Sequence, residues 1–328
     1  MEDKMQRQAV RTNPLISQRG IALVMVLWIL VFLTVIVLSF SATVRTEAYS
    51  VLSFKKDIEN KFLAEAGIQR GLMEILYRNV NKNQKVIVEG REALAIDGRA
   101  YQSPIGDGFY TFRIMDESGK ININALSDNT RVILYNLIVN RGIPGQEADA
   151  VVDSILDWKD ADDLQRPNGA ESDYYLSLPD PYRAKNASFD TLEELLLVKG
   201  MTPQILFGED GKSGIAPMLT VHSVTGKINV KAAPREVLTA IPGVTADLAD
   251  SIIALRESSP EEVIQQLKAL FGKSYDAMAP YIGAGDSNIY TIDAVGYRED
   301  KRKGYAIKAT IIMESGSKYR TIYYKSPA

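Results

Sequence analysis

The densest concentration of residues able to do chemistry lies between positions 149 and 173. This stretch holds eight acidic side chains and two basic ones, Lys159 and Arg166. Six of the acids are candidate metal ligands: Asp157, Asp160, Asp162, Asp163, Glu171 and Asp173. Gly169 allows a tight return of the chain, which would bring Glu171 and Asp173 back towards the other four.

Oxygen ligands without a neighbouring histidine or cysteine suit Ca²⁺ rather than zinc. The stretch is not an EF-hand, because the D-x-[DN]-x-[DN]-G pattern is absent. A solvated acidic turn is the alternative, and composition alone does not separate the two. Aromatic residues accompany the acids, among them Trp158, Tyr174, Tyr175 and Tyr182. Because several carboxylates beside packed aromatics repel one another without a cation, these neighbours favour a structural calcium site.

The sequence offers little else for catalysis. It has no cysteine and a single histidine, His222, which excludes a cysteine nucleophile, a disulfide framework and a histidine-rich zinc site. The G-x-S-x-G, H-E-x-x-H and P-loop patterns are also absent. We therefore expect a protein that is not an enzyme. The net charge of −3 provides no basic surplus of the kind that holds nucleic acid.

The elements that position the acidic stretch begin with an apolar helix. Residues 21–40 read IALVMVLWILVFLTVIVLSF, with only Thr34 and Ser39 polar. Twenty helical residues span about 30 Å, the thickness of a bilayer core, which predicts a transmembrane helix over residues 21–44. Residues 1–20 carry four basic and two acidic side chains. The positive-inside rule therefore predicts a single-pass bacterial inner-membrane protein with a cytoplasmic amino terminus and a periplasmic carboxyl-terminal domain.

The residues before this helix resemble a type IV prepilin processing site. A short basic leader ends in Gln18-Arg19-Gly20 and is followed directly by the apolar run. The resemblance implies cleavage between Gly20 and Ile21 by a prepilin peptidase, with methylation of the new amino terminus. Pilins usually carry glutamate at the fifth mature position, where this chain has Met25. The absence of this glutamate favours a subunit that has no other subunit above it in the filament, rather than a bulk filament subunit.

The remaining pattern predicts an α+β fold. Helical spacing continues from the membrane segment to about residue 78, which gives a long, pilin-like helix whose outer half packs on a globular head. Strand-like alternation predicts a small antiparallel sheet from residues 108–115, 288–296, 304–313 and 318–324, the last two joined by a hairpin at 314–317. Helices are expected at 130–140, 148–158, 192–198, 234–240, 246–255 and 261–270. The sheet is thus split by a large helical insertion.

These elements define five regions. They are a leader at 1–20, the transmembrane part of the helix at 21–44, the helix continuation with the first strands at 45–118, an inserted helical domain at 119–285, and the final strands at 286–328.

The predicted insertion contains an internal echo. GKININA at 119–125 returns as GKINVKA at 226–232, and GIPG at 142–145 returns as AIPG at 240–243. The spacing indicates two related helical units rather than a solenoid. The second unit resembles a helix-hairpin-helix, whose glycine amides can hold a phosphate, so a membrane-tethered DNA-binding protein is an alternative function. The turn carries Asp247 and Asp250 but no lysine, which favours a packing module and no nucleic-acid partner.

Taken in order, these segments resemble the minor pseudopilin K family of the bacterial type II secretion system. The most specific are GKININ at 119–124, DWKDADDLQRPNGAESDYY at 157–175, PYRAKNASFDTLEELLLVKGMTP at 181–203 and INVKAAPREVLTAIPGV at 228–244. The resemblance implies a pilin fold with a helical domain inserted in its sheet. It also implies a place at the tip of the periplasmic pseudopilus, where the protein supports assembly and export of folded proteins, and a complex with minor pseudopilins I and J. Finally, it implies calcium in the helical domain, carried over to the six acidic candidates.

Overall fold

The computed structural model describes residues 18–80, 94–209, 211–223, 225–258, 262–285, 287–314 and 318–328. Most of the expected leader and the turn of the expected hairpin, residues 315–317, lie outside this part. The chain divides into two units, the first ending at Glu59 and the second spanning Asn60–Ala328.

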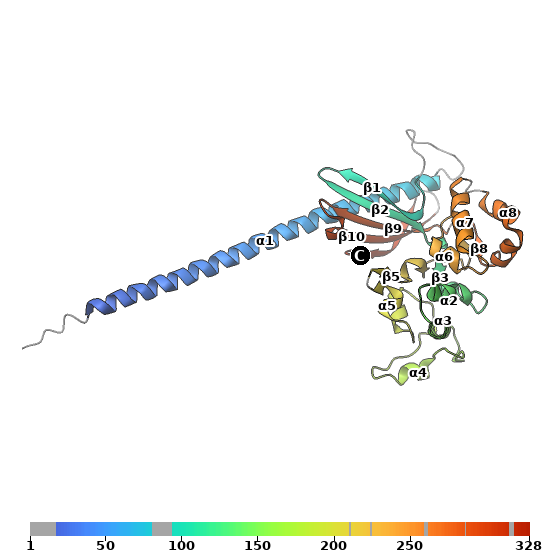
Figure 1. Cartoon of the computed structure of the whole chain (residues 1–328), viewed down its shortest axis with the longest axis horizontal. Helices are drawn as coiled ribbons and strands as arrows, with labels where there is room; N and C mark the ends of the chain where they lie inside the picture. The colour runs from blue at the N-terminus through green and yellow to red at the C-terminus, as the bar shows by residue number, and fades with distance from the viewer. Residues whose placement is uncertain are drawn as a thin grey trace, which may run out of the picture. The chain divides into compact units, whose positions relative to one another are not determined.

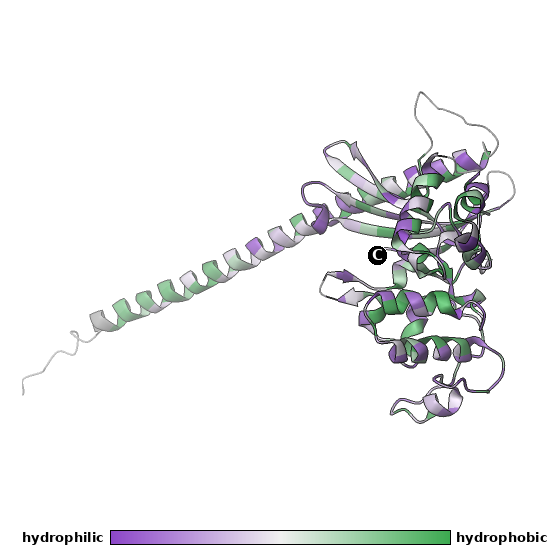
Figure 2. Cartoon of the chain, turned by 45° about the vertical axis from the view of Figure 1, so that its right-hand side comes forward, coloured by the Kyte–Doolittle hydropathy of each residue, from purple (hydrophilic) through white to green (hydrophobic). Residues whose placement is uncertain are grey.

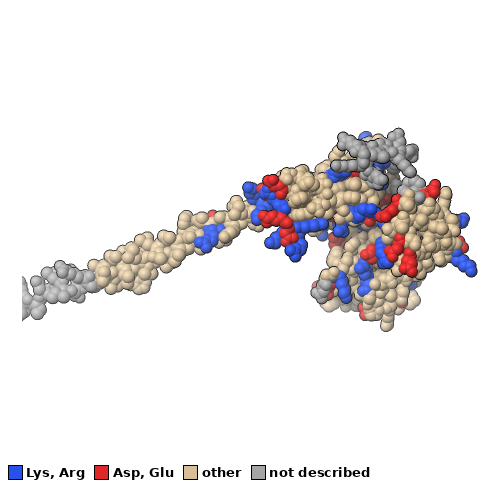
Figure 3. All heavy atoms as spheres, turned by 45° about the horizontal axis from the view of Figure 1, so that its top comes forward, with Lys and Arg blue, Asp and Glu red and all other residues tan. Residues whose placement is uncertain are grey.

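A single helix, α1 (Gln18–Val80), carries the apolar amino-terminal run. Its side chains from position 21 to 58 are exposed, and Figure 2 shows the first part of this stretch as mainly hydrophobic. Residues 21–44 contain no charged side chain, and in Figure 3 blue and red atoms appear only further along the helix. Within the described residues, α1 is the one helix long and apolar enough to cross a membrane. The predicted long helix is therefore confirmed.

Five antiparallel strands form the sheet of the second unit, in the order β1-β2-β9-β10-β11. Their bounds are β1 (Asp97–Ile105), β2 (Gly108–Asp116), β9 (Ile289–Tyr297), β10 (Tyr305–Met313) and β11 (Tyr319–Lys325). Figure 1 shows β1 and β2 beside β9 and β10, although about 170 residues separate β2 from β9. The four predicted strands are all present, and β1 was not predicted.

The last turns of α1 pack on this sheet at unusually short range. Ala64, Ile68, Leu72 and Ile75 recur every three or four residues and are buried with the inward side chains of β2, β9 and β10. Gly296 of β9 lies so close to the α1 backbone that a side chain there would overlap the carbonyl of Asn60 and the amide of Ala64. Small residues thus allow backbone-to-backbone approach.

The insertion leaves the sheet after β2 and returns before β9, and one buried carboxylate closes it. Asp116, at the end of β2, is fully buried. Its Oδ1 accepts hydrogen bonds from the backbone N–H of Ser118 at 2.8 Å and from the hydroxyls of Ser118 and Ser287, both at 2.7 Å. Because Ser287 lies two residues before β9, the two ends of the insertion meet at Asp116.

Inside the insertion, helices dominate and form a separate hydrophobic core. They are α2 (Arg131–Asn140), α3 (Gly145–Lys159), α4 (Ser172–Leu176), α5 (Pro203–Leu206), α6 (Arg235–Ala240), α7 (Ala246–Ser258) and α8 (Val263–Met278). Short strand pairs join β3 (Ile121–Asn122) with β6 (Leu219–Thr220), β4 (Gly208–Glu209) with β5 (Lys212–Ser213), and β7 (Ile228–Asn229) with β8 (Ile282–Gly283). The helix expected at 192–198 is instead a 3₁₀ helix, η4 (Glu193–Leu197), in which the amides of Leu195 and Val198 donate to carbonyls three residues earlier.

The sequence echo corresponds to two helical hairpins. α2 and α3 are joined through Gly142 at φ 88°, and α6 and α7 through Gly243 at φ 82°, a backbone region that favours glycine. Asn136 of α2 donates to the carbonyl of Ala240 at 2.9 Å, which ties the first hairpin to the second.

The close approach of β9 to α1 gives a test of the fold. Gly296→Ala should lower the denaturation midpoint of the detergent-solubilised chain by an amount equivalent to about 1–3 kcal/mol, because neither backbone can yield. Gly285→Ala is the matched control, since no heavy atom lies within 4 Å of its added carbon. Equal midpoints for the two variants would contradict the packing described here.

Candidate functional site

The acidic stretch begins on the buried face of α3. Asp153 and Asp157 lie four residues apart, so both point to one side of the helix, and both are almost fully buried. Each is matched by an arginine: Arg131 Nη1 lies 2.6 Å from Asp153 Oδ1, and Arg166 Nη1 lies 2.7 Å from Asp157 Oδ1. A buried carboxylate without such a partner would be strongly destabilising.

Arg166 connects three carboxylates from separate positions in the chain. Besides Asp157, its Nη1 lies 2.6 Å from Asp160 Oδ2, and its Nε lies 3.2 Å from Asp128 Oδ1, before α2. Its backbone N–H also donates to Asp157, at 3.2 Å to Oδ2. Burial nevertheless raises the pKa of Asp157 above its usual value, and Arg166 pulls in the opposite direction.

Gly169 produces the return of the chain that the sequence predicted, but for a steric reason. A side chain at this position would overlap Oδ2 of Asp157, so only glycine lets the returning segment lie against that carboxylate. The segment then enters α4 and an aromatic cluster in which Trp158 and Tyr175 meet edge to face, with ring centroids 5.1 Å apart. The expected packing of aromatics beside the acids is therefore present.

Glu171 is the residue in this loop whose charge is least compensated. It is 5% exposed, and neither carboxylate oxygen has a hydrogen-bond donor among the described residues. Burial, followed by the charges of Asp157, Asp160, Asp163 and Asp162, raises the pKa of Glu171 to about 7. Oδ1 of Asp160 is likewise buried without a donor in the described structure. These three oxygens are thus buried without a compensating donor among the described residues.

Of the six predicted ligands, Asp157, Asp160, Asp162 and Asp163 lie near enough for their charges to act on a fifth, Glu171. Asp173, in the first turn of α4, has an exposed side chain, and no ion pair or hydrogen bond with a described residue joins it to the others. Across the described residues, no three His, Cys, Asp or Glu side chains converge as they would around a bound metal ion. The sequence analysis missed the part played by Arg166, although that residue is one of only two cations in the acidic stretch.

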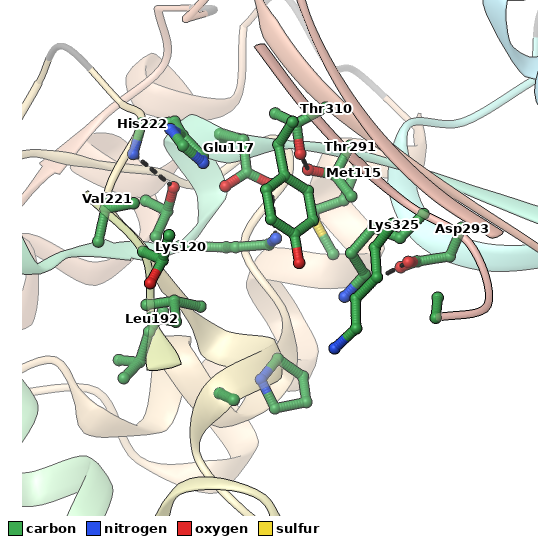
Figure 4. Close-up of a pocket in the computed structure, with 18 of the residues that line it drawn as sticks. Met115, Glu117, Lys120, Leu192, Val221, His222, Thr291, Asp293, Thr310 and Lys325 are labelled. Atoms are coloured by element: carbon green, nitrogen blue, oxygen red, sulfur yellow. Dashed lines mark hydrogen bonds and ion pairs between the residues drawn. The ribbon is translucent and has the colours of Figure 1, made fainter. Parts of the chain in front are cut away.

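A second polar site lies between the sheet and the insertion. Figure 4 shows a cavity of about 460 Å³ with Glu117 and Lys120 on one side and Thr291 and Thr310 on the other. Glu117 is 2% exposed, and its partner Lys120 Nζ at 2.5 Å is the main influence that lowers the Glu117 pKa against the effect of burial. The two residues are three positions apart in the turn that follows β2, so this ion pair is a local structural contact.

His222 also lines this cavity. Burial lowers the pKa of its imidazole, so the ring is neutral at pH 7. No hydrogen bond with a described residue links the ring to a serine or a carboxylate, and the Thr220 hydroxyl binds the backbone N–H of His222 instead. The geometry therefore contains no arrangement for nucleophilic catalysis at the single histidine.

The second hairpin turn is occupied by internal contacts. A carbon added at Gly243 would lie 2.8 Å from the side chain of Ala277 in α8. Arg235 is held by Asp250 through bonds of 2.6 and 2.9 Å. Arg256, at the other end of α7, donates to the carbonyl of Ala233 at 2.6 Å and lies 3.3 Å from Asp97. Both arginines of this hairpin are thus committed within the protein, which favours the packing role over phosphate binding.

Comparison with known proteins points to one family. Residues 119–207 match the family model "Type II secretion system (T2SS), protein K". The type II secretion system protein K of Pectobacterium carotovorum is 32% identical over 110 residues, which cover 30% of this chain and 34% of that protein. The protein K of Pseudomonas aeruginosa is 26% identical over 260 residues, or 73% of each chain.

A solved structure shares the fold. One chain in the crystal structure of the GspK–GspI–GspJ complex from enterotoxigenic Escherichia coli superposes with a TM-score of 0.57 at 16% identity, covering 86% of this chain and 99% of that one. The alternative of a membrane-tethered DNA-binding protein finds no support in these matches. The described helix, sheet and insertion agree with these matches, and the chain is similar to type II secretion system protein K in sequence and in fold.

Proposed function

We propose that this chain, a minor pseudopilin of the type II secretion system, caps the tip of the pseudopilus. In that position it contributes to pseudopilus assembly and to the export of folded periplasmic proteins across the outer membrane. The observation that carries the proposal is α1, a helix with an uncharged, exposed apolar run and Met25 at the position where pilins usually have glutamate. A subunit with nothing above it has no use for a buried carboxylate in lipid.

The same helix offers a surface for minor pseudopilins I and J. Phe54, Ile58 and Phe62 follow one another at helical spacing and are 67%, 38% and 63% exposed. The opposite face of the last α1 turns is the one that packs on the sheet. The structurally similar complex contains GspI and GspJ together with GspK, so we assign the exposed face of α1 to the helices of those two partners.

Partner binding can be tested by co-purification. The chain should form a ternary complex with minor pseudopilins I and J from the same cell, and Phe62→Asp should weaken it at least tenfold, as loss of a buried aromatic anchor does. Leu270→Asp is the matched control, since Leu270 is 64% exposed on α8. If wild type forms no complex, or if Leu270→Asp disrupts it as much as Phe62→Asp, the assignment fails.

Membrane insertion and processing complete the proposed assembly. We place the amino terminus in the cytoplasm and the second unit in the periplasm, on the basis of the basic leader. The Gly20–Ile21 bond lies in the first turn of α1, where few hydrogen bonds hold the helix and local unwinding costs little. This position supports access by a prepilin peptidase.

Processing should yield a mature chain that begins with a methylated Ile21. Intact-mass measurement and amino-terminal sequencing of membrane-extracted protein provide the readout. Gly20→Val should leave the leader attached, whereas Gln18→Ala should be processed normally. A mature protein that begins at Met1, or one cut near residues 40–50, would refute this processing site.

A calcium ion in the acidic loop is the second part of the proposal. The residue types fit, because Glu171 and Asp160 hold buried oxygens without donors and carboxylates are the ligands that Ca²⁺ prefers. Glu171, Asp160, Asp162 and Asp163 are the residues that would hold the ion. Asp157 is already bound on both oxygens, and Asp173 lies in the first turn of α4 with no described contact to the other acids. Calcium would supply positive charge to this loop and fix its conformation.

Calcium should raise the melting temperature of the detergent-solubilised chain, by the equivalent of about 2.7 kcal/mol at a hundredfold excess over Kd. Magnesium should do less, because it requires octahedral geometry and releases water reluctantly. Asp160→Asn should abolish the shift, and Asp173→Asn should retain most of it. Identical melting temperatures in chelator and in millimolar calcium would leave the stretch as a solvated loop.

The raised pKa of Glu171 predicts a pH dependence in chelator. The folded protein holds the Glu171 proton more tightly than the unfolded chain does, so stability is highest below pH 4.5 for this group and is lost as pH rises to about 7. Glu171→Gln should therefore melt higher than wild type at pH 8 in chelator, by up to about 3 kcal/mol in stability, and gain nothing from calcium.

A further inference from the structure

Arg166 is the cation that holds the acidic loop together. Lys159, the other basic residue of the stretch, donates to the carbonyls of Leu126 at 2.7 Å and Asn124 at 3.1 Å, away from the carboxylates. Lys199 reaches the carbonyl of Gly169 at 2.9 Å rather than an acidic side chain. This leaves the Arg166 guanidinium to neutralise the loop from within.

The contacts of Arg166 divide the carboxylate oxygens into two sets. The bound set comprises both oxygens of Asp157 and Oδ2 of Asp160, and the exposed Asp128 holds the other side of the guanidinium. The unbound set comprises Oδ1 of Asp160 and both oxygens of the buried Glu171. Asp160 belongs to both sets, because one of its oxygens contacts Arg166 and the other has no donor in the described structure.

We propose that Arg166 is a resident cation of this loop, which holds the loop closed without calcium and sets its calcium affinity. The inference rests on the proposed calcium site and adds the means by which that site is tuned. The guanidinium links Asp157 and Asp160, at the end of α3, to Asp128, before α2, so it preserves the loop when no metal is bound. Because it also binds one oxygen of Asp160, it shares a carboxylate with the proposed site.

Two consequences of opposite sign follow from this position. The fixed positive charge of Arg166 would repel a divalent ion and occupies carboxylate oxygens that the ion would attract, so Arg166 weakens calcium binding. Without calcium, removal of Arg166 leaves the fully buried Asp157 with no counter-charge, which is costly. Arg166 therefore lowers the calcium affinity and raises the stability of the calcium-free protein.

The experiment is calcium titration of the full chain in detergent by isothermal calorimetry, with melting temperatures in chelator and in saturating calcium. Arg166→Gln should bind calcium about tenfold more tightly than wild type and melt several degrees lower in chelator. The deficit should largely disappear in saturating calcium. Arg183→Gln removes one exposed positive charge elsewhere in the insertion, so it should match wild type in both measurements.

Arg166→Lys covers the case in which Arg166→Gln does not fold without calcium. Lysine keeps the charge but cannot bridge three carboxylates, so calcium affinity should stay within about threefold of wild type while the melting temperature in chelator falls. If wild type and variants all fail to bind calcium, the calcium proposal fails. If wild type binds and Arg166→Gln binds equally or more weakly, the calcium site stands and the role given to Arg166 is wrong.

Discussion

The closure of the insertion at Asp116 is the constraint on which the rest of the structure depends. One carboxylate receives the hydroxyl of Ser118 at the start of the excursion and that of Ser287 at its end, 171 residues further along the chain than Asp116. Since β2 and β9 are neighbours in the sheet, the chain can leave and return at almost the same point. The entropy of closing such a loop grows only slowly with its length, so a large domain can be accommodated there without disturbing the strand order.

The two hydrophobic cores follow from this arrangement. One lies between α1 and the sheet, and the other fills the insertion, where it includes residues of both helical hairpins. Each half thus buries its own apolar surface. The ion pair of Arg256 with Asp97 joins α7 of the insertion to β1 of the sheet. Charged residues here fix the orientation of packed parts rather than perform chemistry.

Much of the architecture could be predicted from hydrophobic periodicity, because in long helices and strands the spacing of apolar residues indicates which face is buried. The strand at Asp97–Ile105 could not, since DGRAYQSPI alternates weakly and owes its conformation to pairing with β2. The five residues of α4 are too few for a helical pattern. For the acidic loop, the sequence predicts the gathering of carboxylates and the need for Gly169.

The sequence alone could not show which carboxylates Arg166 selects. Its partners stand 6, 9 and 38 positions away, and only the tertiary fold brings Asp128 to the loop. The sequence also could not show that Glu171 is buried without a hydrogen-bond donor from the described part of the chain, because its burial depends on the tertiary fold. The sequence thus shows which residue types gather in the loop, but it does not show which cation pairs with which carboxylate.

The close approach of β9 to α1 has a mechanical consequence. Gly296 lies against the α1 backbone, and side chains added at Gly67 or Gly71 would lie within 2.9 Å of Ala294 and Ile292 on the same strand. Contacts made by backbone and short side chains have almost no slack, because there are few rotatable bonds to yield under load. An axial pull on this part of α1 is therefore transmitted into the central strand of the sheet as force, with little displacement lost on the way.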